Sequence, residues 1–159
     1  MYVGEEIKQQ IFDAKGNLKA VKIYIQGPFL GKGGFARVYS IQEVKTEEIF
    51  AAKQVRKSNL EKRNSQKKLM QEIRVHENLN HPHVVKFKKY FHDDNFVYLL
   101  LELCKNTSLS QLMKNRKKLS ELETKYYTRQ IIKGLVYLHQ NQIIHRDLKL
   151  GNIFLDDKM

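Results

Sequence analysis

The chain has a single cysteine, Cys104, so no disulfide can form within it. A lone thiol fits a reducing compartment. The N-terminal segment 1–16 carries charges throughout and lacks the apolar centre of a secretory signal. The longest apolar run, 96–101, is far too short to span a bilayer. These absences predict an intracellular protein with no membrane partner.

The sequence also lacks internal repeats, an Arg-rich tail and the aromatic pattern of an RNA-binding sheet. Its formal net charge is +12, which a nucleic acid, an anionic membrane or an acidic substrate could complement. The lysines are spread along the chain, and the densest basic run, 60–74, also contains Glu61 and Glu72. We therefore interpret the charge as a basic solvated surface and predict no nucleic-acid partner. Steeply salt-dependent binding of DNA or RNA would contradict that interpretation.

Enough apolar sequence is present for a folded core, because 42% of the residues are hydrophobic. Alternating apolar and polar residues predict five strands, with a turn of Asp and Asn at 93–95 between the last two. The predicted strands are 20–30, 36–44, 49–55, 84–91 and 95–103.

Helical spacing predicts three helices, over 58–79, 108–118 and 121–140, and a short strand is expected at 152–155. Ser58 or Asn59 could cap the first helix. Ser120 and Glu123 form the sequence signature of a capping box at the start of the third. The predicted fold is α+β: a five-stranded antiparallel sheet with one inserted helix, followed by the first helices of a helical region.

A glycine-rich turn, GKGGFARVY, occupies residues 31–39 between two predicted strands. Gly31 and Gly33 have no side chain, so backbone N–H groups there can approach phosphate oxygens. An ordinary hairpin is the alternative. A dinucleotide-binding turn fits poorly, because a strand follows instead of a helix. Val38 would either pack in the core or cover a flat ring.

Lys53 lies in an apolar predicted strand, where a buried ammonium needs a partner. Glu72 on the first predicted helix could supply that partner and aim Lys53 at phosphates. The alternatives are a lysine that reaches water at the end of a strand and a carboxylate on an exposed helix face.

The segment HRDLKLGN, 145–152, is the strongest chemical pattern in the sequence. Asp147 can accept or orient the proton of an attacking hydroxyl. Lys149 can neutralise a moving phosphoryl group, and Asn152 offers a carbonyl oxygen to Mg²⁺. The alternative is a polar turn in which Asp147 only caps the backbone.

Together these segments resemble the protein-kinase set of motifs over residues 24–159. The stretches FLGKGGFARVY, HPHVVKF, FVYLLLELC and IIHRDLKLGNIFL are similar to those of polo-like kinases. The resemblance implies an N-terminal extension, 1–23, and a kinase domain, 24–159. That domain would consist of a β-rich lobe (24–101), a hinge (102–106) and the start of a helical lobe (107–159), with ATP between the lobes.

The same resemblance implies an activity and a cellular setting. The protein would use ATP and Mg²⁺ to phosphorylate Ser and Thr hydroxyls of proteins that act in cell division. It would work in the cytoplasm and nucleus, at centrosomes, spindle poles and kinetochores.

Site residues follow from the resemblance position by position. The glycine-rich turn would cover the phosphates of ATP with Leu30, Gly31, Lys32, Gly33, Gly34, Phe35, Ala36 and Val38. The adenine would be held by Ala51, Leu101 as gatekeeper, Glu102, Cys104 and Phe154. Phosphates, substrate hydroxyl and Mg²⁺ would be handled by Lys53 with Glu72, Asp147 as base, Lys149 and Asn152 as the metal ligand.

The 159 residues contain no Asp-Phe-Gly and no Ala-Pro-Glu. We therefore expect the chain to be a truncated kinase domain that is inactive alone, because a principal Mg²⁺ ligand is missing. A non-catalytic nucleotide- or partner-binding fragment is the alternative. The apolar stripe of the helix 121–140 should be exposed, which predicts poor solubility of the isolated chain.

Overall fold

A computed structural model describes residues 4–34, 36–106 and 108–156. The chain divides into two compact units. One comprises residues 1–79 and 86–103 and is called here the sheet unit. The other comprises 80–85 and 104–159 and is called the helical unit.

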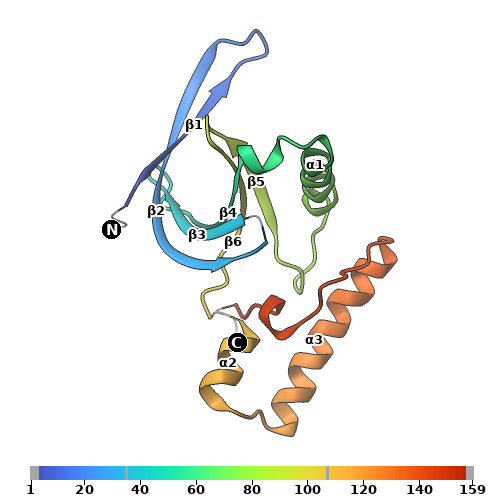
Figure 1. The fold of residues 1–159 in the computed structure, drawn as a ribbon. Helices are drawn as coiled ribbons and strands as arrows, with labels where there is room; N and C mark the ends of the chain where they lie inside the picture. The colour runs from blue at the N-terminus through green and yellow to red at the C-terminus, as the bar shows by residue number, and fades with distance from the viewer. Residues whose placement is uncertain (1–3, 35, 107, 157–159) are drawn as a thin grey trace. The chain divides into compact units, whose positions relative to one another are not determined.

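The sheet unit contains one antiparallel sheet with the strand order β1-β2-β3-β4-β6-β5 (Figure 1). Its strands are Glu6–Phe12 (β1), Leu18–Lys32 (β2), Ala36–Glu43 (β3), Ile49–Arg56 (β4), Phe87–His92 (β5) and Phe96–Glu102 (β6). β2 is the longest strand and curves around the unit in Figure 1. The register between β2 and β3 shifts on either side of Phe29. Such irregularities let a strand bend while it stays paired.

β1 corrects the sequence prediction, which had five strands and not six. It pairs with β2 in antiparallel register, with Ile7 opposite Tyr24. Ile7 is its one fully buried side chain, and the remaining positions are exposed or half-buried. A strand with one buried residue gives only a weak alternation of apolar and polar residues, so the sequence did not reveal it.

One face of the curled sheet encloses an aromatic core. Tyr24, Ile41 and Leu100 are fully buried there. The Phe91 ring stacks on Tyr24 at 5.1 Å and on Tyr98 at 4.9 Å between ring centroids. Each large apolar side chain buried in this way contributes about 1.5–3 kcal/mol. The core draws residues from all six strands, which is consistent with the curl of the sheet.

The opposite face packs against the helix α1, Arg63–Glu77. Leu69 and Ile73 lie one turn apart on α1 and are buried with Val55 of β4 and Leu99 of β6. Lys53 lies on β4, two residues before Val55. α1 therefore covers the part of the sheet that carries Lys53.

The start of α1 differs from the predicted helix, 58–79. Residues Lys57–Leu60 form a separate 3₁₀ helix, η1, and α1 begins only at Arg63. Its N-cap is Lys62, which makes no capping hydrogen bond with its side chain. The prediction that Ser58 or Asn59 caps α1 is therefore wrong.

The turn predicted at 93–95 is confirmed. Asp93 Oδ1 accepts the backbone N–H groups of Asn95 and Phe96, both at 2.8 Å. Asp93 Oδ2 accepts the hydroxyl of Tyr98 at 2.7 Å. One carboxylate thus closes the β5–β6 hairpin and satisfies a core tyrosine.

The helical unit contains α2 (Leu109–Arg116), α3 (Glu121–Gln140) and the 3₁₀ helix η2 (Leu150–Asn152). The predicted bounds of α3 and its capping box are confirmed. Ser120 Oγ accepts the N–H of Glu123 at 3.2 Å, and the Glu123 carboxylate accepts the N–H of Ser120 at 2.8 Å. The strand expected at 152–155 is absent from the described residues, which hold only an isolated β-bridge between Ser108 and Phe154.

The segment 80–85 packs on α3. The hydroxyl of Tyr137 accepts the backbone N–H of Asn80 at 2.9 Å, and the ring of His81 stacks on Tyr137 at 4.8 Å. The backbone oxygen of His83 lies so close to Gly134 that a Cβ there would sit 2.7 Å from it. Gly134 therefore permits this close approach.

The expected exposure of the apolar side of α3 is partly confirmed. The predicted stripe consists of Leu122, Tyr126, Ile131, Leu135 and Leu138. Leu122 and Tyr126 are exposed, Ile131 and Leu135 are half-buried, and Leu138 is buried. Ile132 and Val136, outside that stripe, are also exposed.

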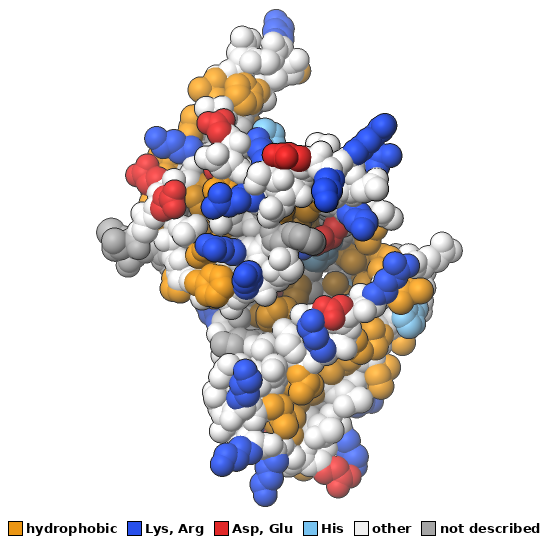
Figure 2. Space-filling model, viewed as in Figure 1, with side chains coloured by type: hydrophobic (Ala, Val, Ile, Leu, Met, Phe, Trp, Pro, Cys, Tyr) orange, Lys and Arg blue, Asp and Glu red, His pale blue; other side chains and the backbone are white. Residues whose placement is uncertain are grey.

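Basic side chains are spread over the displayed surface with carboxylates between them, as Figure 2 shows. The most buried carboxylate is Glu43, which pairs with Lys22 at 2.8 Å and with Lys89 at 3.2 Å. Within the part of the chain that the structure describes, no helix has the length and apolar character needed to cross a membrane.

Candidate functional site

The glycine-rich turn joins β2 to β3, with Gly31 opposite Val38 and the Gly33 N–H bonded to the oxygen of Ala36 at 2.9 Å. None of Gly31, Gly33 and Gly34 has the positive φ that favours glycine. A Cβ at Gly31 or Gly34 would meet no atom within 4 Å, and one at Gly33 would meet only Ala36 O at 3.9 Å. Backbone strain and internal crowding therefore do not explain these glycines. The space beside their backbone is open to a ligand.

Three apolar residues predicted for the nucleotide site share one face of the sheet with Lys53. Val38 lies opposite Lys53 across β3 and β4, and Ala51 lies opposite Leu101 across β4 and β6. Residues two apart on a strand, and residues directly opposite each other, point to the same face. This is the face on which Leu99, the partner of Lys53 on β6, packs against α1.

Lys53 forms the predicted ion pair with Glu72. Lys53 Nζ lies 2.6 Å from Glu72 Oε1, which links β4 to α1. Glu72 precedes the buried Ile73, so the packing of α1 fixes the position of its carboxylate. The ammonium is thereby held in one place while 29% of the lysine side chain stays exposed to a ligand.

Two predicted hinge residues lie at the border of the units. The carboxylate of Glu102 accepts the N–H of Lys86 at 2.7 Å, and the N–H of Glu102 donates to the oxygen of Lys86 at 3.0 Å. These bonds fix the end of β6. Cys104 is the residue at which the chain enters the helical unit for the second time, and it forms no disulfide.

The loop 145–152 gathers its polar groups on Asp147. Oδ2 of Asp147 lies 2.9 Å from Lys149 Nζ and accepts Asn152 Nδ2 at 2.8 Å. The same Nδ2 also donates to the backbone oxygen of Asp147 at 2.7 Å. A five-residue separation in sequence becomes a direct contact because η2 turns the chain back at Asn152.

The backbone of this loop contains a strained residue. Arg146 has φ 61°, in the left-handed region that non-glycine residues rarely adopt. The N–H of Asp147 donates to His145 Nδ1 at 3.3 Å. Such conformations cost about 1–3 kcal/mol and cluster at functional sites. The left-handed backbone of Arg146 therefore favours a functional role for the segment 145–147.

The pKa of Asp147 is lowered. The hydrogen bond from Lys149 is the largest cause, followed by that from Asn152. The carboxylate is therefore ionised at neutral pH. A base with a lowered pKa withdraws protons weakly, so the arrangement suits orientation of a hydroxyl better than early removal of its proton.

Comparisons with known proteins agree with these features. The protein kinase domain family matches residues 24–159. The chain belongs to the protein kinase family. It is 48% identical to the serine/threonine-protein kinase polo of Drosophila melanogaster over 96% of the chain and 27% of that protein.

Two further relatives show similar identity. A probable serine/threonine-protein kinase PLK of Dictyostelium discoideum is 51% identical over 89% of the chain and 14% of that protein. The serine/threonine-protein kinase PLK1 of Xenopus laevis is 50% identical over 86% of the chain and 23% of that protein. The chain thus spans about a quarter or less of the length of these kinases.

The predicted kinase residues fall into two groups. The sheet unit holds Leu30, Gly31, Lys32, Gly33, Gly34, Ala36, Val38, Ala51, Lys53, Glu72, Leu101 and Glu102. The helical unit holds Cys104, Asp147, Lys149, Asn152 and Phe154. Phe35 lies outside the described residues. Within its unit, each group includes a direct contact, Lys53 with Glu72 and Asp147 with Lys149 and Asn152.

The residues present fit Mg²⁺ and a nucleotide. Asn152 makes two hydrogen bonds to Asp147 through Nδ2, which leaves the carbonyl oxygen Oδ1 as the acceptor for a cation. Mg²⁺ commonly binds through one or two protein oxygens together with phosphates and waters. The open glycine backbone and the ammonium of Lys53 are suited to phosphate oxygens.

Sequence reasoning missed one member of this kinase loop, His145. Its imidazole accepts the N–H of Asp147 and so helps to set the backbone that presents the carboxylate. The signal was available, because His145 is the first residue of the quoted motif.

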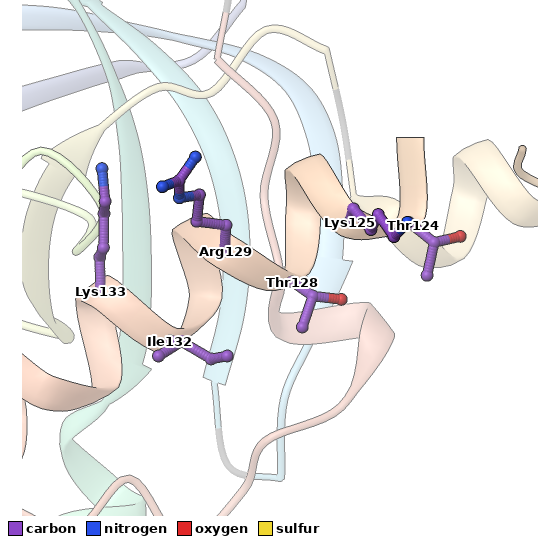
Figure 3. Close-up of a pocket in the computed structure, with 6 residues that line it drawn as sticks. All are labelled: Thr124, Lys125, Thr128, Arg129, Ile132 and Lys133. Atoms are coloured by element: carbon purple, nitrogen blue, oxygen red, sulfur yellow. The ribbon is translucent and has the colours of Figure 1, made fainter. Parts of the chain in front are cut away.

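An open hollow of about 450 Å³ lies along α3, and none of the predicted kinase residues lines it (Figure 3). Its lining residues all belong to α3: Thr124, Lys125, Thr128, Arg129, Ile132 and Lys133. Figure 3 shows Arg129 and Lys133 extending toward the same side of the helix. Because one helix supplies every lining residue, this is a helix surface and takes no part in the proposed reaction.

Proposed function

We propose that this chain is the ATP-binding and catalytic-loop region of a polo-like serine/threonine kinase that acts in cell-cycle control. The observation that carries the proposal is the contact of Asp147 with both Lys149 and Asn152. It brings together an ionised acceptor, a cation and an amide in the loop where phosphoryl transfer needs all three.

The proposed reaction moves the γ-phosphoryl group of ATP to a Ser or Thr hydroxyl of a protein. The bond from the γ-phosphorus to the β–γ bridging oxygen breaks and ADP leaves with that oxygen, while a bond from phosphorus to the substrate oxygen forms. The proton of the hydroxyl passes to the Asp147 carboxylate as that bond forms. Bound Mg²⁺ would neutralise charge on the phosphates, with Asn152 as one of its protein ligands.

The residues of the chain position the ATP phosphates and the substrate hydroxyl, and they neutralise charge on the phosphoryl group. Glu72 holds the Lys53 ammonium ready for the α- and β-phosphates. Asp147 orients the substrate hydroxyl, because its lowered pKa keeps it an acceptor. Lys149 offsets charge on the moving phosphoryl group while its own bond to Asp147 keeps it close.

The cellular setting is inferred from relatives. One of them, from Saccharomyces cerevisiae, is named a cell cycle serine/threonine-protein kinase and is 49% identical over 85% of the chain. We infer an intracellular protein that works at centrosomes, spindle poles and kinetochores. Its partners would be ATP and protein substrates, with no nucleic acid and no membrane.

Phosphate transfer to casein by the protein at its natural length tests the proposal. Asp147→Asn should lower the rate by about 10²–10⁴-fold, the range for loss of a positioned acid or base. Asp94→Asn is the matched control, because Asp94 is an exposed turn residue far from the loop in sequence. Nucleotide binding is measured on the same samples.

The results of these assays distinguish a kinase from a non-catalytic nucleotide-binding protein. Transfer that Asp147→Asn abolishes and Asp94→Asn preserves supports the kinase. Nucleotide binding by the unaltered protein without any transfer would assign a non-catalytic nucleotide-binding role. Equal transfer by both variants would overturn the role of Asp147.

A further inference from the structure

A second hollow, of about 230 Å³, lies in the sheet unit and is strongly basic. The residues that line it are Lys32, Gly34, Ala36, Arg37, Gln54, Arg56, Asn59 and Phe96. They come from the end of β2 and the turn after it, from β3, β4 and η1, and from the start of β6. We call it the arginine hollow.

The arginine hollow lies on the sheet face opposite Lys53. Arg37 is opposite Gln54, and Gln54 is opposite Tyr98, which is buried in the aromatic core. Lys53 follows the other alternation and faces α1 with Leu99. The arginine hollow therefore borders the predicted nucleotide site, with which it shares Lys32, Gly34 and Ala36, while its two arginines lie on the sheet face opposite Lys53.

Strand pairing brings its three cations together. Lys32 lies opposite Arg37 across β2 and β3, and Arg56 lies opposite Phe96 across β4 and β6. The guanidinium of Arg56 is 5.4 Å from the centre of the Phe96 ring, a cation–π distance that restrains it. No carboxylate is among the residues that line the hollow.

Elsewhere in the sheet unit, cations have carboxylate partners. Lys22 and Lys89 share the buried Glu43, Lys88 pairs with Glu48, and Lys53 pairs with Glu72. Within the ranges that the structure describes, Lys32, Arg37 and Arg56 take part in no such ion pair. By sequence the closest carboxylates to the lining residues are Glu61 and Asp94, both exposed, and neither lines the hollow. Asp93, one residue further away, is occupied by its own turn and by Tyr98.

Converging cations without a counter-charge favour an anion. Two guanidinium groups present planar forks that match the oxygens of phosphate or carboxylate. A phosphate monoester carries about −1.5 to −2 charges at neutral pH, closer than a single carboxylate to the three positive charges. The volume is below the range of about 300–1,000 Å³ typical of sites for whole cofactors, so a single phosphate group fits better than a nucleotide.

We propose that the arginine hollow binds a phosphate monoester. Arg37 and Arg56 hold the phosphate oxygens, Lys32 adds charge, and the ring of Phe96 forms an apolar wall beside the phosphate. A phosphorylated side chain of a protein and free inorganic phosphate share this chemistry. The site does not depend on the kinase reaction proposed above.

The test measures binding of two probes, inorganic phosphate and a short phosphoserine peptide, at constant ionic strength by NMR titration. The protein is used at its natural length and saturated with a non-hydrolysable ATP analogue and Mg²⁺, so that phosphate sites near Lys53 are filled. Arg37→Gln and Arg56→Gln should each weaken binding by roughly tenfold. Arg74→Gln, an exposed arginine of α1, is the matched control and should leave binding unchanged.

Two further variants keep the result interpretable. Arg37→Lys and Arg56→Lys retain the charge but lose the fork, so each should weaken binding less than the glutamine variant does. All substituted positions are exposed, and the melting temperature is measured for every variant. Loss of binding with an unchanged melting temperature supports the site.

The two probes identify the source of the phosphate. Tighter binding of the phosphoserine peptide than of both inorganic phosphate and the unphosphorylated peptide supports the site and assigns it to a phosphorylated protein segment. Equal affinity for both phosphate probes supports the site and assigns it to the free ion. Binding that the glutamine variants leave unchanged, or no binding of either probe, overturns the proposal.

Discussion

Lys53 is the residue whose role depends most clearly on one partner. Its ion pair with Glu72 is partly open to solvent, with 29% and 47% of the two side chains exposed. Ion pairs of that kind contribute at most about 1 kcal/mol to stability. The larger consequence of the pair is positional, because Glu72 fixes where the ammonium can meet a phosphate.

Exchanging the charges of Lys53 and Glu72 distinguishes the role of the pair in placing the ammonium from its contribution to stability. Lys53→Glu and Glu72→Lys should each lower the free energy of unfolding by about 1 kcal/mol, since two like charges then face each other at a partly exposed site. The double variant should recover that stability because the pair is restored in reverse. Nucleotide affinity should not recover, because a carboxylate then stands where the phosphates bind.

Denaturant unfolding and nucleotide titration on the four proteins check this prediction. A double variant that regains nucleotide affinity would show that Lys53 serves only to join β4 to α1.

The start of α3 illustrates how a local sequence signal fixes an element. The capping box of Ser120 and Glu123 is formed in both directions, and Arg116 from the end of α2 also bonds the Glu123 carboxylate. The backbone N–H of Ser120 is the largest cause of the lowered pKa of Glu123, which falls from 4.5 to about 2.

The stability contributed by Glu123 should therefore have a defined pH window. A carboxyl whose pKa is depressed on folding contributes fully above its unfolded pKa and loses the contribution as pH falls through the folded pKa. The difference in unfolding free energy between the unaltered chain and Glu123→Gln should be constant above pH 4.5 and should shrink between pH 4.5 and about 2.

Thermal or urea unfolding from pH 2 to 7 measures that difference, with Glu121→Gln as the control in the same helical turn. Ser120→Ala should cost about 1 kcal/mol at pH 7 through loss of the other half of the box. A Glu123→Gln difference that persists unchanged to pH 2 would contradict the assignment.

Gly134 is the position where α3 meets the segment 80–85. A methyl group there would sit 2.7 Å from the backbone oxygen of His83. Gly134→Ala should destabilise the protein by about 1–3 kcal/mol, because the clash exceeds the gain in helix propensity of about 1 kcal/mol. Gly151→Ala, which meets no atom within 4 Å, is the control and should be close to neutral in urea unfolding.

The elements that the sequence predicted well are those with local signals. α3 has a capping box and a helical apolar pattern, and the β5–β6 turn has Asp93 at the position that closes it. β1 was missed because its burial comes from pairing with a strand that follows it in sequence. The start of α1 was misplaced because η1 shares its helical spacing without belonging to it.

In the candidate site, too, some features were predictable from local sequence signals and others were not. Motif order was enough to select Lys53, Glu72, Asp147 and Asn152 and to predict the first ion pair. The shared contact of Asn152 with Asp147 and the left-handed backbone of Arg146 depend on how the loop closes. Loop closure involves tertiary constraints that residue types alone do not specify.

The whole molecule combines a net charge of +12 with an open apolar face on α3. The exposed apolar side chains of that face are Leu122, Tyr126, Ile132 and Val136. At 100° per residue they fall within about a third of the helix circumference, and that arc also carries Lys125, Arg129 and Lys133. Apolar attraction and charge repulsion therefore oppose each other on one surface.

The isolated 159-residue chain should consequently self-associate more as salt is added. Repulsion among the cations is screened over about 30 Å at 0.01 M salt and about 3 Å at 1 M, while burial of the apolar face is not weakened. Light scattering across this range should show growing association that Leu122→Gln with Ile132→Gln reduces. Leu18→Gln, an equally exposed apolar residue of β2, is the control.

A chain that stays monodisperse at every salt concentration would contradict the prediction. Association that falls with salt would point instead to contacts between unlike charges.

β1 lies before the first residue of the kinase family match, yet it contributes to the core of the sheet unit. The kinase family match begins at residue 24, in the middle of β2, whereas Ile7 of β1 is buried against the same core as Tyr24. A polypeptide started at residue 24 would cut β2 in two and open one side of the aromatic core to water. The matched kinase domain and the packed core therefore have different first residues, because the core already includes Ile7.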